Sequence, residues 1–167
     1  MFYTRILDKH SERDLQFLLV MLYESIHIPE NKPAKEKLLN SPSIKKYSDG
    51  WGRQGDRAVI ALSEDNMLVG AAWYRLFTEN QKGYGYVDSN TPEIGIAVKD
   101  DVRGNGIGTL LLKKLFETAL EDGYTSLSLS VDPNNTEAVQ LYRKLGFKQC
   151  GTSGTSWTMV CHIPQSL

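Results

Sequence analysis

The sequence predicts an α/β protein in which a mixed, mostly antiparallel sheet is flanked by helices. A strand, two helices and a strand hairpin come first, and patterns for β-α-β-α-β follow. The expected order is therefore β-α-α-β-β-β-α-β-α-β. At 167 residues the chain is long enough to bury a proper core, and we expect residues 1–167 to form a single domain.

The chain is predicted to open with a strand and an amphipathic helix. Residues 2–7 have the composition of a strand. Residues 11–27 follow a helical period, and Ser11 is a plausible N-terminal cap. Pro29 ends this helix, because proline cannot continue the hydrogen-bonding pattern. The helix is amphipathic because its apolar side chains recur at Leu15, Leu18, Leu19, Leu22 and Ile26.

Residues 33–90 have a less regular sequence pattern. A short polar helix is expected at 33–40, and the proline and glycines of 41–54 favour a loop. Residues 57–63 and 67–77 are predicted to form a hairpin. A polar, glycine-broken excursion then occupies 78–90.

The second half alternates strands and helices. Strands are predicted at 93–98 and 124–131, and a further strand begins at Phe147. Helices are predicted from residue 107 onward and at about 136–145, where Gly146 supplies the left-handed residue that ends many helices.

Composition excludes several functions. With 19 basic and 20 acidic residues the net charge is −1, so we expect no nucleic-acid partner. Cys150 and Cys161 are too few and too isolated for a disulfide framework or a metal site, and they fit a reducing cytoplasm. No signal peptide or membrane-length apolar run is evident. We therefore expect a cytoplasmic protein that uses neither metal nor membrane.

Residues 103–108, Arg-Gly-Asn-Gly-Ile-Gly, predict an anion-binding loop. They lie where a strand turns into the first turn of a helix, and there the unpaired N–H groups and the helix dipole favour a negative charge. Gly104, Gly106 and Gly108 let a phosphate approach the backbone without meeting a Cβ atom. Arg103 adds a permanent positive charge. We expect this loop to lie where the central strands of the sheet diverge.

The spacing of these glycines argues against the common nucleotide motifs. Counted from Gly104, the third glycine of a Rossmann fingerprint would fall on Thr109. A Walker A loop would need Lys-Ser/Thr after Gly108, where the chain has Thr109-Leu110. A nucleotide-binding regulatory domain is therefore disfavoured, and a glycine-rich turn that binds nothing stays open at this point.

Two motifs resemble the GNAT acyltransferases. Arg103-x-x-Gly106-x-Gly108 is similar to their acetyl-CoA signature, Q/R-x-x-G-x-G/A. The second motif, N-x-x-A-x-x-L-Y-x-K-x-G-F, is matched further along at Asn135, Ala138, Leu141, Tyr142, Lys144, Gly146 and Phe147. The resemblance covers roughly residues 57–162. It implies the GNAT fold and an N-acetyltransferase that uses acetyl-CoA, in which the amine attacks the thioester directly in a ternary complex.

The resemblance also implies which residues bind acetyl-CoA. The pantetheine arm would lie along the main chain of Ile96, Ala97 and Val98. Asn135 would bond to the arm, cap the following helix, or do both. Tyr142 would face the thioester sulfur, and Lys144 is a candidate for the 3′-phosphate. The pyrophosphate would be held by the amides of Arg103, Gly104, Asn105, Gly106, Ile107 and Gly108, and Thr109 is a further candidate for binding the cofactor.

Two residues are candidates for catalysis. Tyr142 matches the family tyrosine that protonates the departing thiolate, although helical spacing would also place an aromatic there in the core. Glu93 lies where many family members carry a base, often acting through water, and a structural ion pair is the alternative. A non-catalytic acyl-CoA-binding module on the same fold stays open, and the presence of both residues argues against it.

The acceptor is the least defined part of the prediction. Aromatic residues beside carboxylates suit a cationic amine, and they equally suit the packing of a loop on a sheet. A small-molecule amine, a protein lysine and a peptide α-amine all remain open, as does a homodimer. The candidate acceptor residues are Trp51, Trp73, Tyr84 and Tyr86.

Overall fold

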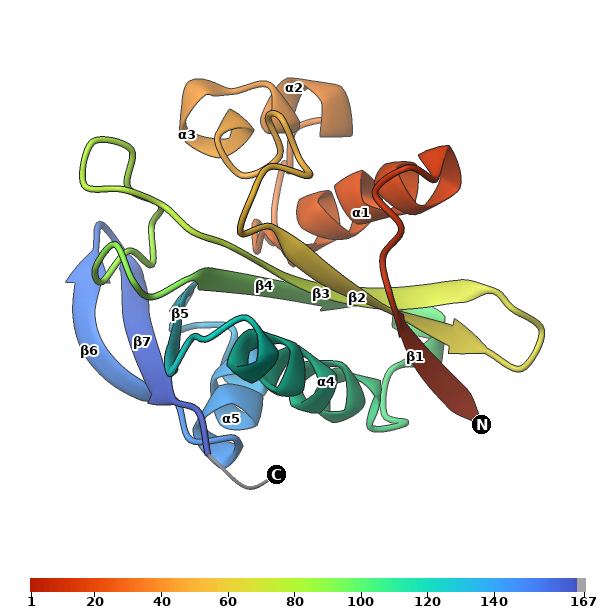
Figure 1. Ribbon diagram of the computed structural model, residues 1–167. Helices are drawn as coiled ribbons and strands as arrows, with labels where there is room; N and C mark the ends of the chain where they lie inside the picture. The colour runs from red at the N-terminus through yellow and green to blue at the C-terminus, as the bar shows by residue number, and fades with distance from the viewer. Residues whose placement is uncertain (165–167) are drawn as a thin grey trace.

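The computed structural model describes residues 1–164, which contain a seven-stranded sheet of order β1-β2-β3-β4-β5-β7-β6 (Figure 1). Neighbouring strands are antiparallel except β4 and β5, which are parallel. The prediction of a mixed, mostly antiparallel sheet is confirmed. The strands are β1 (Phe2–Ile6), β2 (Arg57–Ser63), β3 (Leu68–Arg75), β4 (Glu93–Val98), β5 (Ser126–Val131), β6 (Lys148–Ser153) and β7 (Ser156–His162).

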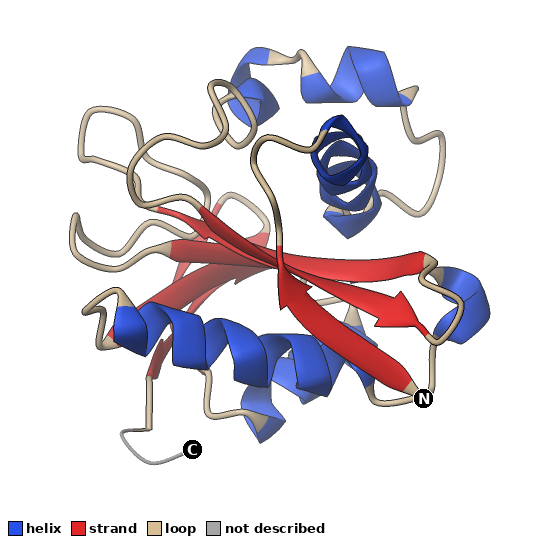
Figure 2. Ribbon diagram, turned by 45° about the vertical axis from the view of Figure 1, so that its right-hand side comes forward, coloured by secondary structure: helices blue, strands red, loops and turns tan. Residues whose placement is uncertain are grey.

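Helices cover both faces of the sheet. One face carries the N-terminal helices and the other carries the helices of the second half (Figures 1 and 2). None of the helices within residues 1–164 is long and apolar enough to cross a bilayer. The first group is α1 (Glu12–Ser25), α2 (Lys35–Leu39) and α3 (Pro42–Lys45), and the second is α4 (Ile107–Glu121) and α5 (Thr136–Lys144), with a 3₁₀ turn, η1 (Asp100–Val102), before α4.

The sheet separates two apolar cores, because successive side chains of a strand point to opposite faces. On β3, Trp73 packs into the core under α1, whereas Tyr74 packs into the core under α4. Leu18 and Met21 anchor α1 to the first core. The second core is larger and includes Ile107, Leu111, Leu112, Leu115 and Phe116 of α4.

Besides the 3₁₀ turn η1, the structure adds two elements to the expected order. The single last strand that the sequence suggested is a hairpin, β6 and β7, which turns at Gly154 with a φ of 60°. The hairpin inserts β7 next to β5 and leaves β6 at the sheet edge. In addition, the segment 41–54, expected to be loop, starts with the short helix α3, and Pro42 occupies its first turn, where proline is well tolerated.

The central strands diverge almost as soon as they meet. Only Glu93 of β4 and Ser128 of β5 form a register pair, and the Ser128 N–H donates to the Pro92 carbonyl at 2.9 Å. From there to Val98 the edge of β4 that faces β5 has no strand partner among the described residues. The loop that is predicted to bind an anion follows the far end of β4, beside this gap, where its position was expected.

Candidate functional site

A cavity of about 1030 Å³ occupies the gap between the diverging strands. Its walls come from β4, the loop before α4, α5, the end of α1 and the segment around α3. The β6–β7 turn also contributes through Ser153 and Ser156. Among the predicted site residues, the lining includes Trp73, Tyr84, Glu93, Ile96, Ala97, Val98, Arg103, Gly104, Gly106, Ile107, Gly108, Thr109, Asn135 and Tyr142.

The loop before α4, predicted to bind an anion, forms one end of the cavity. Gly104 and Gly106 have φ angles of 85° and 75°, and a Cβ atom added to either would meet nothing within 4 Å. Gly106 caps α4, and no side chain bonds to the first-turn amides. Uncapped amides facing open space at a helix N-terminus suit a phosphate. The Arg103 guanidinium pairs with Asp100 at 3.2 Å and is half-exposed.

The exposed edge of β4 connects this loop to the interior of the cavity. Ile96, Ala97 and Val98 line it, and they pair with β3 on their other side. Because β5 has already diverged, the main chain of these residues is open to an extended ligand that would lie beside β4 like another strand.

Tyr142 of α5 and Asn135, which directly precedes this helix, line the same cavity. The Tyr142 ring packs edge-on against Phe147, with centroids 5.7 Å apart, and the side chain is 7% exposed. Burial raises the pKa of its hydroxyl above the ordinary value, so the group is protonated at neutral pH. Asn135 caps α5 by accepting a hydrogen bond from the Ala138 N–H at 3.4 Å.

Glu93 is buried at the inner end of the cavity. One carboxylate oxygen accepts a hydrogen bond from the Tyr47 hydroxyl at 2.7 Å, and the other accepts one from the Gly85 N–H at 3.0 Å. Burial raises the pKa of Glu93 to about 7, while the two hydrogen bonds and the charge of Lys46 oppose that rise. A carboxylate that titrates near neutrality can serve as a base.

Two glycines allow a loop to reach this carboxylate. A Cβ atom on Gly83 would lie 2.2 Å from a Glu93 oxygen. On Gly85 it would lie 2.5 Å from the carbonyl carbon of Leu129 on β5. The segment 83–85 therefore fills the point of the gap where β4 and β5 separate, and positions 83 and 85 have no room for a side chain.

Four predicted site residues lie outside the cavity lining. Trp51 lies behind the wall, in a smaller cavity that it shares with Trp73. The hydroxyl groups of Tyr86 and Ser89 are 3.0 Å apart. Asn105 donates its side-chain amide to the Val102 carbonyl, and Lys144 is exposed at the end of α5. Residues 1–164 contain no group of three or more His, Cys, Asp or Glu residues that could hold a metal ion.

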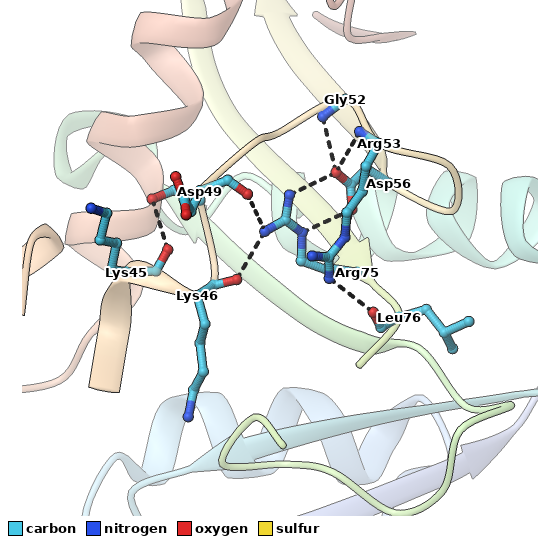
Figure 3. A network of polar contacts seen from close by, with 9 residues as sticks. Lys45, Lys46, Asp49, Gly52, Arg53, Asp56, Arg75 and Leu76 are labelled. Carbon is cyan, nitrogen blue, oxygen red and sulfur yellow. Dashed lines mark hydrogen bonds and ion pairs between the residues drawn. The ribbon is translucent and has the colours of Figure 1, made fainter. Parts of the chain in front are cut away.

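A buried ion pair fixes the wall around α3 (Figure 3). The Arg75 guanidinium, on a residue 1% exposed, donates twice to Asp56, at 2.9 and 2.8 Å. It also donates to the main-chain carbonyls of Lys46 and Asp49, each at 2.8 Å. Neither this pair nor Tyr47 could be predicted from the sequence, because no local pattern links residues so far apart in the chain.

The chain also resembles known proteins. A model of the acetyltransferase (GNAT) family matches residues 20–147. An L-methionine sulfoximine/L-methionine sulfone acetyltransferase of Pseudomonas paraeruginosa is 30% identical over 105 residues, which are 63% of this chain and 58% of that protein. A streptothricin acetyltransferase of Streptomyces lavendulae is 30% identical over 127 residues, covering 70% of this chain and 63% of that protein.

The fold has close counterparts among solved structures. One is the PaiA N-acetyltransferase of Thermoplasma acidophilum in complex with coenzyme A, with a TM-score of 0.65 and 23% identity. The match covers 96% of this chain and 99% of that one. The alignments with the two curated relatives above span about three fifths of each relative's length.

We predict that Asp56→Ala destabilises the protein strongly, because it leaves the Arg75 charge buried without its partner. The expected loss in free energy of unfolding is about 3–5 kcal/mol, measured by urea denaturation. Asp65→Ala is the control, since Asp65 is exposed in the β2–β3 turn, and there we expect a change within about 0.5 kcal/mol. Equal losses in the two variants would contradict a special role for the buried pair.

Proposed function

This chain belongs to the GNAT family of acetyltransferases, and we propose that it transfers the acetyl group of acetyl-CoA to a primary amine within a ternary complex. One observation carries the proposal. A single cavity holds an uncapped helix N-terminus at one end and the side chains of Glu93 and Tyr142 deeper inside. These are the parts that phosphate binding, amine deprotonation and thiolate protonation require.

The residues present fit coenzyme A. The open space over Gly104 and Gly106 accommodates a pyrophosphate, and the amides of the first turn of α4 would bond to it. The free edge of β4 along Ile96–Val98 suits the amide groups of a pantetheine arm. Asn135 lies on the opposite wall, within the same lining.

Two side chains would handle the protons of the reaction. Glu93, as carboxylate, takes a proton from the acceptor ammonium, directly or through water. The neutral amine then attacks the thioester carbonyl, a C–N bond forms and the C–S bond breaks. Tyr142, whose hydroxyl stays protonated at neutral pH because burial raises its pKa, supplies a proton to the departing thiolate. The second proton of the attacking nitrogen then returns to the Tyr142 oxygen, directly or through water, which leaves the neutral amide and restores the hydroxyl.

We propose a small-molecule amine as the acceptor. Trp73 and Tyr84 give the inner cavity aromatic surface near the Glu93 carboxylate, which suits a compact cation. The matched acetyltransferases that are named for methionine sulfoximine and streptothricin support an acceptor of this size.

The experiment that tests the function is an assay of free thiol. The protein is incubated with acetyl-CoA alone and then with pools of small amines, peptides and proteins. Thiol release that depends on an amine supports the proposal, and the responding pool identifies the acceptor class. Binding of acetyl-CoA without release from any pool would instead indicate a non-catalytic acyl-CoA-binding module.

We predict that acetyl-CoA raises the melting temperature and that Gly106→Val abolishes this rise, because the side chain enters the phosphate space. Gly123→Val is a matched control: Gly123 follows the other end of α4, has a φ of 89° and also faces open space. Both variants lose stability from backbone strain, and only Gly106→Val loses the response to ligand. A similar response in the two variants would refute the phosphate assignment.

We predict that Tyr142→Phe lowers kcat by about 10²–10⁴-fold, because it removes a general acid and keeps the ring. The rise in melting temperature with acetyl-CoA should equal that of the parent protein. Steady-state kinetics and thermal unfolding check the two halves of this prediction. Near-normal turnover together with reduced stability would show that Tyr142 only packs the core.

We predict that Glu93→Gln removes a titration from the pH–rate profile. The parent's kcat/KM should rise with pH through about 7, because only the ionised carboxylate accepts a proton. With the same acceptor, the glutamine variant should be much slower and lack that rise, while acetyl-CoA still stabilises it. An unchanged acidic limb would assign Glu93 to structure.

A further inference from the structure

The Tyr47 hydroxyl is held in one orientation by the groups on either side of it. The Tyr84 N–H lies 2.6 Å from the Tyr47 oxygen, and the Glu93 carboxylate lies 2.7 Å away. A backbone N–H can only donate, so the Tyr47 oxygen accepts from Tyr84. The single hydroxyl proton is therefore directed at Glu93.

Glu93 is thus held at both oxygens by groups that only donate to it. The oriented Tyr47 hydroxyl occupies one oxygen, and the Gly85 N–H, at 3.0 Å, occupies the other. A proton cannot arrive at the carboxylate along either of these directions. A proton can still approach the carboxylate from the side of Glu93 that lines the cavity.

We propose that Tyr47 is a positioning residue that fixes the Glu93 carboxylate so that it receives a proton from the cavity side. The proposal rests on the proposed function, in which Glu93 is the base. It adds a residue to the reaction that neither family motif contains. Tyr47 touches Glu93, and its role is exerted through that carboxylate.

The surroundings hold Tyr47 rigidly enough for this role. Its ring packs edge-on against buried Phe77, with centroids 5.1 Å apart, and lies parallel to Tyr84 at 6.5 Å. The preceding residue, Lys46, is tied through its carbonyl to Arg75. The hydroxyl is therefore positioned by the same network that fixes the cavity wall.

No charged group within residues 1–164 contacts the Glu93 carboxylate, so hydrogen bonds contribute an important part of the stabilisation of its ionised form. Arg75 lies directly opposite Glu93 in the β3–β4 register, yet its guanidinium is bonded to Asp56 and to two carbonyls. Lys46 favours the carboxylate from a distance, with its ammonium 5.3 Å from the Tyr84 ring centroid. The donors in contact with the carboxylate are Tyr47 and Gly85.

The sign of the effect follows from which form of Glu93 the hydroxyl stabilises. A donor favours the ionised carboxylate, so removing it raises the pKa of Glu93. Tyr47→Phe should therefore move the acidic limb of kcat/KM to higher pH, by about one unit, the shift expected for loss of one hydrogen bond to a charged group. Activity should fall most below neutral pH and recover in part above it.

Tyr74→Phe is a matched control for this experiment. The Tyr74 hydroxyl also bonds to a carboxylate, that of Asp122 at the end of α4. Neither Tyr74 nor Asp122 lines the cavity. This variant should be less stable than the parent protein, and the acidic limb of its kcat/KM profile should not move. A second measurement needs no catalysis: the Glu93 carboxyl carbon is titrated by NMR in both variants and in the parent, and is assigned from its absence in Glu93→Gln.

Parallel upward movement of the NMR titration and the acidic limb in Tyr47→Phe, with neither moving in Tyr74→Phe, supports the proposal. An unmoved Glu93 titration overturns it, whatever the activity. A titration that moves without the limb also overturns it, since Tyr47 would then not affect the reaction. A parent protein that acetylates no amine would refute the proposed function, and the titration would still decide the Tyr47 contact separately.

Discussion

The separation of β4 from β5 is the constraint on which the site depends. The two parallel strands share the pair Glu93–Ser128 and no further pair among the described residues, so beyond it the backbone groups of β4 that face β5 have no partner within the sheet. Unpaired backbone groups are stable only next to water or a ligand, and the strand therefore requires a cavity along this edge. From the far end of β4 the chain passes through η1 into the loop that precedes α4, so the Glu93 carboxylate and the uncapped amides of α4 lie toward opposite ends of β4.

The inner end of the cavity is held by tertiary contacts. Two segments meet at the Glu93 carboxylate, one that follows α3 and one at 83–85. Neither has regular secondary structure around the contact. The first is anchored by Arg75, and the second fits because glycines at 83 and 85 let it pack against Glu93 and β5. A carboxylate so enclosed loses solvation and acquires a pKa near neutrality, which links the packing of two loops to acid–base chemistry.

Sequence patterns predicted those parts of the candidate site that are formed by local backbone conformation. The loop at 103–108 could be predicted because positive φ angles and a helix start leave glycine in the sequence, and Tyr142 because it lies within a continuous helical motif. Helix α3 could not be predicted because four residues carry no periodicity, and the final hairpin resembles a single strand in sequence because its tight turn interrupts the pattern only briefly. Tyr47 and Arg75 acquire their roles from partners many residues away, which no window along the chain contains.

The Arg75 network has a bearing on how such a site evolves. Arg75 and Asp56 bind the segment 46–53 largely through main-chain groups: the carbonyls at 46 and 49, and the amides at 52 and 53. Since those bonds do not depend on side-chain identity, selection can exchange several side chains of this segment while its path is retained. The path of this part of the chain, and with it the placement of Tyr47 in the cavity wall, is thereby made largely independent of the other side chains of the segment.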